Sequence, residues 1–160
     1  MQYTDIFSLE TYDGNETNIS YRIAGDGPPL LLLHGFPQTN MMWHKIAPAL
    51  AERYTVVAAA LRGYGDSGHP ASDAAHAPYS KRTMAADMAE LMRGLGYDSF
   101  MVAGHDRGGR VAHRLARDHG DCVSRIAVLD IAPTAAMYGQ TDMCFATAYY
   151  HWFFLIQPAP

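Results

Sequence analysis

Residues 102–110 read Val-Ala-Gly-His-Asp-Arg-Gly-Gly-Arg. A short apolar strand, then Gly-x-Asp-x-Gly, then a helix-forming stretch is the pattern of a sharp strand-to-helix turn centred on Asp106. Gly104 and Gly108 flank that residue because a Cβ on either side would collide inside so tight a turn. We expect the turn to lift the Asp106 side chain above the sheet, at a helix N-terminus whose dipole favours an anion.

An aspartate in this position has the properties of a nucleophile. Its carboxylate needs no base to deprotonate it, so it can attack a carbon atom directly and form an alkyl ester with the enzyme. The alternative is that Asp106 is an ordinary helix N-cap, a position that aspartate fills well. The preceding strand and the flanking glycines favour the nucleophile.

The segments around this turn alternate between strand and helix patterns. Short apolar runs predict buried strands at residues 30–33, 54–61, 100–103 and 123–129. Helical spacing of apolar residues predicts helices at 42–53, 80–94 (capped by Ser80) and 107–119. An antiparallel hairpin is predicted before them, with strands at 3–12 and 18–24 and a turn at 13–15. This order predicts an α/β fold with a mostly parallel sheet and helices on both faces.

Composition narrows the class of protein. The chain has 160 residues and a net charge of −4, with 49% apolar and 18% charged residues, which is typical of one globular domain. The mildly acidic balance argues against nucleic acid as the main partner, because that partner would call for a basic stripe on one face. No apolar run approaches the roughly 20 residues that cross a membrane. Two cysteines without disulfide density, and an N-terminus without an export signal, predict a cytoplasmic protein.

Neither a metal site nor a nucleotide cofactor is predicted. The eight histidines include no pair at metal-ligand spacing, since His113 and His119 lie six residues apart. Residues 63–68 match the Gly-x-Gly-x-x-Gly pattern, but a loop follows them where a phosphate would need a helix N-terminus.

Two arginines follow the central aspartate. Arg107 and Arg110 are three residues apart in the first turn of the helix, so they share a face beside Asp106. Cations there oppose the helix dipole, which indicates that an anion lies between them. A substrate carboxylate would fit, because the guanidinium fork matches its planar geometry. The alternative is a solvated basic stripe, since Arg114 and Arg117 continue the same face.

In five segments the chain resembles the α/β-hydrolase superfamily, and within it the haloacetate (fluoroacetate) dehalogenases. The matching segments are Leu-Leu-His-Gly-Phe-Pro-Gln at 32–38, Leu-Arg-Gly-Tyr-Gly-Asp-Ser at 61–67, the turn at 104–110, Leu-Asp-Ile-Ala-Pro-Thr at 129–134 and the aromatic stretch at 149–160. The first two are shared with epoxide hydrolases and haloalkane dehalogenases. The two arginines and the pair His151-Trp152 form the narrower signal.

The resemblance implies roles for further residues. It implies that the Phe36 backbone N–H joins that of Arg107 in an oxyanion hole, and that His151 and Trp152 receive the departing halide. It also implies that Asp130 orients a catalytic histidine. Without the resemblance, an aromatic stripe at helical spacing is more often core, and an acid after a strand is often a turn residue. His34 is predicted to be a hydrogen-bonded loop histidine without a chemical role.

The resemblance also bears on domains. It implies that residues 1–139 form the N-terminal part of the hydrolase core and 140–160 the start of a helical cap, with the rest of both absent. In the family, the catalytic histidine follows the cap, and nothing here corresponds to it. We therefore expect one alkylation without sustained turnover. The strand at 123–129 is expected at an open sheet edge beside a helical aromatic segment at 141–156, which a second copy or another partner would cover.

The sequence thus predicts an enzyme that removes halide from a small haloacid through an Asp106 ester. One alternative is an epoxide or haloalkane hydrolase with the same nucleophile. The other is a non-catalytic fragment that acts through its sheet edge and aromatic helix.

Overall fold

A computed structural model describes residues 2–155, with side chains as far as Trp152. Predictions that fall on residues 156–160, or on the side chains of 153–155, lie outside that range. Six strands form one sheet in the order β1-β2-β4-β3-β5-β6. Their bounds are β1 Ser8–Asp13, β2 Asn18–Ala24, β3 Pro29–Leu33, β4 Thr55–Ala59, β5 Phe100–His105 and β6 Val123–Leu129. β1, β2 and β4 pair antiparallel, and β4, β3, β5 and β6 pair parallel, which confirms the mostly parallel sheet.

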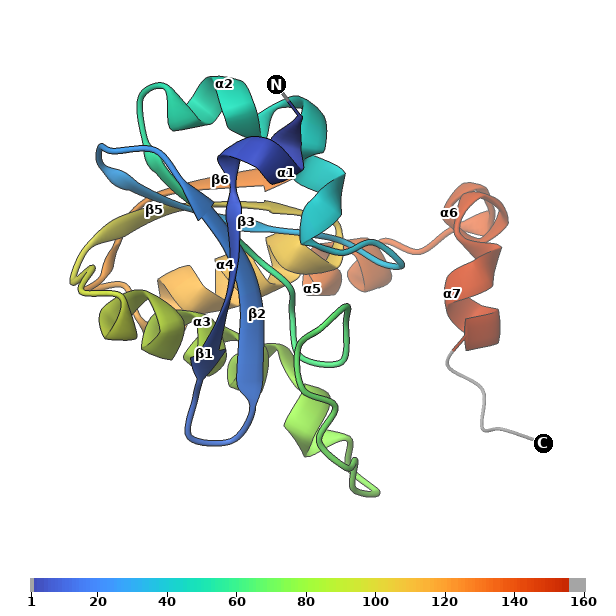
Figure 1. Ribbon diagram of the computed structural model, residues 1–160. Helices are drawn as coiled ribbons and strands as arrows, with labels where there is room; N and C mark the ends of the chain where they lie inside the picture. The colour runs from blue at the N-terminus through green and yellow to red at the C-terminus, as the bar shows by residue number, and fades with distance from the viewer. Residues whose placement is uncertain (1, 156–160) are drawn as a thin grey trace.

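Helices cover both faces of the sheet, as predicted (Figure 1). The helical elements are α1 Tyr3–Ile6, η1 Asn40–Lys45, α2 Ala47–Ala51, η2 Ala77–Tyr79, α3 Lys81–Gly94, α4 Arg107–Asp118, α5 Thr134–Gly139, α6 Met143–Ala148 and α7 Tyr150–Leu155. Helices α3 and α4 lie on one face, and α1, η1 and α2 on the other.

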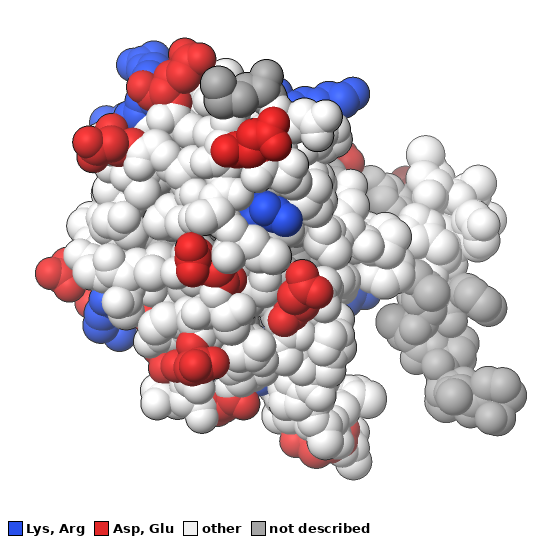
Figure 2. All heavy atoms as spheres, viewed as in Figure 1, with Lys and Arg blue, Asp and Glu red and all other residues white. Residues whose placement is uncertain are grey.

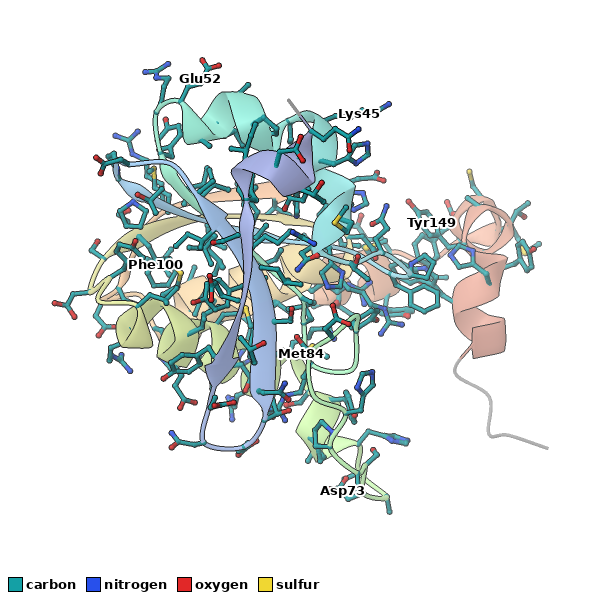
Figure 3. All side chains as sticks on the ribbon, in the orientation of Figure 1. Lys45, Glu52, Asp73, Met84, Phe100 and Tyr149 are labelled. Carbon is teal, nitrogen blue, oxygen red and sulfur yellow. The ribbon has the colours of Figure 1, made fainter. Side chains whose placement is uncertain are left out.

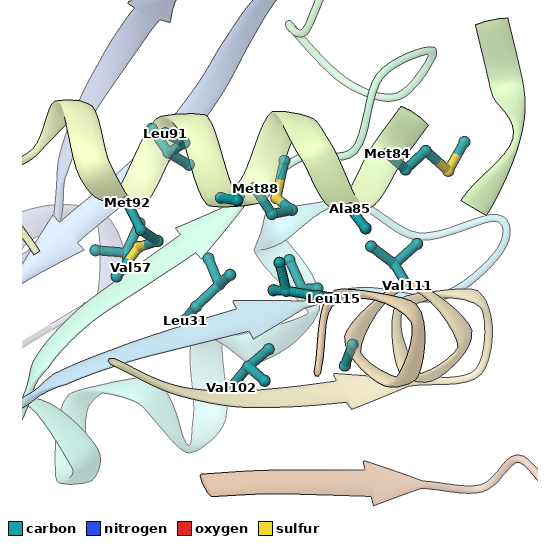
Figure 4. Packing of buried hydrophobic residues seen from close by; sticks show 14 of the residues in the cluster. Leu31, Val57, Met84, Ala85, Met88, Leu91, Met92, Val102, Val111 and Leu115 are labelled. Atoms are coloured by element: carbon teal, nitrogen blue, oxygen red, sulfur yellow. The ribbon is translucent and has the colours of Figure 1, made fainter. Parts of the chain in front are cut away.

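The two-residue period of the strands divides the core into two clusters. Leu31 and Leu33 point to α3 and α4, whereas Leu32 between them points to the cluster that contains Trp43. Figure 4 shows the first cluster, in which Leu31 faces the apolar side of α3. A strand buried on both faces needs apolar residues at every position, which is why a continuous leucine run predicted it correctly.

Helix α3 begins where the sequence indicated. The Ser80 hydroxyl accepts the Thr83 backbone N–H at 3.1 Å and so caps the helix, which ends at Gly94. Met84, Met88 and Met92 recur on its buried face and pack against the sheet (Figure 4).

Two N-terminal predictions were wrong in part. Residues 3–6 form the helical turn α1 instead of strand, because Tyr3 packs its ring 4.5 Å from Phe7 and lies 95% buried. The single helix predicted at 42–53 is divided into η1 and α2. Pro48 stands in the first turn of α2, where its ring would clash with the carbonyl of a continuous preceding turn.

The C-terminal part also differs from the prediction. The segment at 141–156 contains two helices, α6 and α7, which meet at Tyr149, and helix α5 before them was not predicted. Asp142 starts α6 by accepting the Phe145 N–H at 2.8 Å. Strand β6 forms as predicted but is not buried, and Ile126 is 43% exposed, because β6 pairs only with β5 among the described residues. What covers this edge, and whether a domain boundary falls at 139, stay predictions.

A buried ion pair anchors the long loop between β4 and η2. Arg62 is 1% exposed, and its Nε donates to Asp87 of α3 at 2.6 Å. Its Nη1 donates to the Pro78 carbonyl at 2.8 Å. Both ends of the loop are therefore held against α3, while Asp73 lies at the far tip (Figure 3).

Replacing Arg62 with methionine should destabilise the fold by about 3–5 kcal/mol, because it leaves the Asp87 carboxylate buried without a counter-ion. Urea denaturation followed by circular dichroism measures this loss. The double variant Arg62→Met with Asp87→Leu should regain part of it, since no charge then stays buried. Equal stability of the single variant and the wild type would contradict the prediction.

Neither a basic patch on the face in Figure 2 nor a membrane-spanning helix is found in the described residues. On the face shown in Figure 2, acidic side chains are scattered and basic ones are few and separated. Across residues 2–155, no helix combines the length and apolar character that a membrane span requires.

Candidate active site

The turn between β5 and α4 has the strained geometry that the sequence predicted. Asp106 has φ 50° and ψ −115°, a backbone conformation that residues with a side chain rarely adopt. A Cβ on Gly104 would strike the backbone of Gly108, and one on Gly108 would strike the carbonyls of Leu33 and the next residue. Glycine at both positions is therefore required by contact with backbone, which cannot move aside.

Asp106 occupies the N-cap position of α4, but its side chain makes no capping hydrogen bond to that helix. Instead, Oδ1 accepts the backbone N–H of Phe36 at 2.9 Å. Gly35 allows this approach, because a Cβ there would lie 2.7 Å from the Asp106 Cβ. One carboxylate oxygen is therefore held by the loop after β3.

A cavity of about 200 Å³ opens over this carboxylate. Residues from the β3–η1 loop, the turn, α4, α5 and α7 line it: Phe36, Asp106, Arg107, Arg110, Tyr138, His151 and Trp152. Six of the seven site residues predicted from the sequence are among them. The structure thus brings together groups from segments more than a hundred residues apart.

The two arginines at the cavity have no carboxylate partner among the described residues. Arg107 lies over the Phe36 ring, with 5.2 Å from Cζ to the ring centroid, and Arg110 lies over Trp152 at 4.5 Å. The Nε and Nη2 atoms of Arg110 are buried and have no hydrogen-bond partner within the described part of the chain. By contrast, Arg114 pairs with Asp118 at 2.6 Å. The basic-stripe interpretation therefore suits Arg114, whereas the first two cations face a cavity that an anion would complete.

Asp130 does not line this cavity. It follows β6 with φ 51°, and its side chain is 87% exposed. Its Oδ2 lies 3.8 Å from Nε2 of His105, which is its ion-pair contact within the described residues. The backbone still connects it to the turn, since the Asp106 N–H donates to the Leu129 carbonyl at 3.1 Å. Its role as the acid that orients a histidine stays a prediction.

Two tyrosines near the carboxylate were missed by the sequence analysis. Tyr138 reaches the cavity from α5, with its ring centroid 6.1 Å from that of Trp152. Burial raises the pKa of Tyr64, and Asp106 raises it further, whereas Arg107 lowers it. Tyr138 lies in none of the matching segments, and Tyr64 lies within the segment at 61–67 but received no role there. In both cases only the tertiary contact brings the side chain near the site.

His34 has the structural role that was predicted. The ring is fully buried, its Nδ1 lies 2.8 Å from the Gly35 carbonyl, and its Nε2 accepts the Leu61 N–H at 3.0 Å. This bonding requires the neutral ring with its proton on Nδ1. Burial lowers the pKa of His34, although the hydrogen bond to Gly35 acts in the opposite direction.

This pKa predicts an acid-dependent loss of stability. In the unfolded chain, His34 takes up a proton near the ordinary pKa of about 6.5. In the folded chain, His34 stays neutral until a lower pH. The contribution of neutral His34 to the free energy of unfolding is therefore fully present above about pH 6.5, and it is lost as the pH falls towards the folded-state pKa. Denaturant titrations from about pH 7 to 5 should show a shallower pH dependence for His34→Gln than for the wild type, by up to about 1.4 kcal/mol per pH unit. Parallel curves would contradict this.

The family model described as "alpha/beta hydrolase fold" matches residues 28–159 of the chain. The chain belongs to this family. The α/β hydrolase is 53% identical over 96% of its length to the "Fluoroacetate dehalogenase" of Burkholderia sp, and 48% identical over 74% of its length to the "Soluble epoxide hydrolase" of Corynebacterium sp. (strain C12). It also matches the crystal structure of a candidate alpha/beta hydrolase from Nostoc sp PCC 7120, at 61% identity over 98% of this chain and a TM-score of 0.95.

The α/β hydrolase spans about half the length of these relatives: 51% of the dehalogenase, 40% of the epoxide hydrolase and 54% of the Nostoc chain. Within residues 2–155, no three histidine, cysteine or acidic side chains gather as metal ligands would.

Proposed function

We propose that this α/β hydrolase dehalogenates haloacetates through an ester on Asp106. A carboxylate oxygen donates its electron pair to the α-carbon of the acid, a C–O bond forms, and the carbon–halogen bond breaks with its pair leaving on the halide. No proton moves in this step. The observation that carries the proposal is the placement of Asp106 beside Arg107 and Arg110, two cations without a carboxylate partner, in one small cavity.

The arginines distinguish an acid from a neutral substrate. A haloacetate carboxylate held by Arg110 would satisfy the buried Nε and Nη2 and place its α-carbon in the same small space as Asp106. The imidazole and indole N–H groups of His151 and Trp152 border the cavity and would donate to the halide as charge develops on it.

Phe36 gives the two Asp106 oxygens different roles. Because its N–H already holds Oδ1, the other oxygen, Oδ2, is free to attack. After ester formation Oδ1 becomes the carbonyl oxygen. Water attack on that carbonyl would then place the negative charge where Phe36, and the N–H of Arg107, can stabilise it. Asp130 would orient the histidine that activates this water.

A second candidate function is epoxide hydrolysis by the same aspartate. It is favoured by the 48% identity to a protein named as an epoxide hydrolase. It leaves Arg107 and Arg110 without a carboxylate partner, since an epoxide is neutral. The anionic substrate therefore accounts for more of the site.

Fluoroacetate tests the proposal, because it does not alkylate the exposed Cys144 as bromoacetate or iodoacetate would. The 160-residue chain is incubated with excess fluoroacetate or with a neutral epoxide, and fluoride and intact mass are followed. We expect about one equivalent of fluoride and one carboxymethyl group, mapped by peptide mass to Asp106. An adduct with the epoxide alone would favour the second candidate. An adduct with neither would favour the non-catalytic fragment, and repeated fluoride release would overturn the expected single turnover.

A further inference from the structure

A second cavity, of about 420 Å³, shares Arg110 with the catalytic one. Val128 of β6 together with Ile131 and Pro133 of the following loop form its apolar wall. Lys81, at the start of α3, lines it as well. This volume falls in the range of small-molecule sites. Its apolar wall and its few cations suit a ligand that has both an apolar part and a negative charge.

Two of the three Lys and Arg side chains that line this cavity, Lys81 and Arg110, have no carboxylate partner among the described residues. The hydrogen bond that Lys81 Nζ makes is to the sulfur of Met84 at 3.4 Å, a weak acceptor, and no carboxylate pairs with it among the described residues. Arg110 contributes the two buried nitrogens that have no partner. Arg114, which also lines the cavity, is neutralised by Asp118. One anionic group held between Lys81 and Arg110 would satisfy both.

We propose that this cavity binds a linear aliphatic carboxylate, with the carboxylate between Lys81 and Arg110 and the chain against Val128, Ile131 and Pro133. A phosphate or sulfate would leave the apolar wall exposed to water, and a neutral chain would leave both cations unpaired. The inference stands apart from the proposed function, because it concerns binding at a different cavity and needs no reaction at Asp106.

Arg110 borders both cavities, so the two sites are predicted to be linked. A carboxylate in the second cavity would bind the same Arg110 guanidinium as a haloacetate in the catalytic cavity. Each acid should therefore weaken the binding of the other, and by the same factor.

Trp152 supplies a reporter for binding. The chain has two tryptophans, so in a Trp43→Phe background the fluorescence comes from Trp152, whose ring lies over Arg110. Hexanoate, acetate and hexanol are titrated at about pH 7, with calorimetry as a second measurement. Each buried methylene strengthens binding roughly fourfold. Hexanoate is therefore expected to bind at least about tenfold more tightly than acetate, and hexanol to bind more weakly than hexanoate.

Two variants test the location. Lys81→Met keeps the side-chain stem and removes the charge, and should weaken hexanoate about tenfold. Ala132→Trp, at an exposed residue of the lining, fills the cavity and should abolish hexanoate binding while acetate affinity stays within about twofold. Arg82→Met, one residue from Lys81 and 73% exposed, is the matched control and should change nothing. Circular dichroism confirms that each variant is folded.

The pH dependence gives an independent readout. Burial, together with the nearby Arg107 and Arg110, lowers the pKa of Lys81 to about 8, and Asp106 acts in the opposite direction. His113 of α4 is a further titratable residue that lines the cavity. Hexanoate affinity should fall as the pH rises above about 8 in the wild type, and not in Lys81→Arg. Equal affinity for hexanoate and acetate, or hexanoate binding that survives Ala132→Trp, would overturn the proposal and assign the acid to the catalytic cavity.

Discussion

Replacing Asp106 with asparagine is expected to reduce the rate of ester formation from fluoroacetate by about a thousandfold or more. The neutral amide has no anionic oxygen to attack carbon, and nothing else in the proposed step supplies one. The change is nearly isosteric, so the amide oxygen can still accept the Phe36 N–H that now binds Oδ1. Fluoride release and the carboxymethyl adduct, followed over a single turnover, measure the loss.

The matched control is Asp130→Asn. That side chain is 87% exposed and does not line the cavity, so ester formation should proceed at nearly the wild-type rate. Both variants should keep the far-ultraviolet circular dichroism of the wild type. If Asp106→Asn still formed the adduct, the nucleophile would have to be another residue. If Asp130→Asn lost it equally, the acid would act earlier than proposed.

The second large effect concerns the charge of the substrate. Arg110→Leu is expected to slow ester formation from fluoroacetate about a hundredfold, because it removes a charge-assisted pair in a partly buried site. Fluoroacetamide has the same carbon–fluorine bond without the negative charge. Its much slower reaction should be nearly unchanged by the substitution. The ratio of the two rates, measured by fluoride release, therefore isolates recognition of the carboxylate.

Arg117→Leu is the control for this prediction. Arg117 lies on the same helix as Arg110 and lines neither the catalytic nor the second cavity, so its loss should leave the ratio as in the wild type. A general loss of positive potential would lower the ratio in both variants. A ratio unchanged in Arg110→Leu would mean that this guanidinium does not bind the acid.

Strands and the central turn were predictable because their causes are local. A leucine run at 30–33 can only be a strand covered on both faces, and Gly104 and Gly108 mark a turn that no side chain could occupy. The errors arose where packing overrode the pattern. Tyr3 and Phe7 pack their tilted rings against each other around a helical turn, and Pro48 divided one predicted helix into two.

By itself the sequence determined which chemical groups are present and where the tight turn lies, since Gly104 and Gly108 mark it on either side of Asp106. The tertiary structure alone decided which groups meet. The Phe36 N–H reaches Asp106 across 70 residues, and Arg110 lines two cavities, each of which is built from several elements. Such contacts depend on how helices pack on the sheet, a balance of buried surface over the whole chain that no local pattern records.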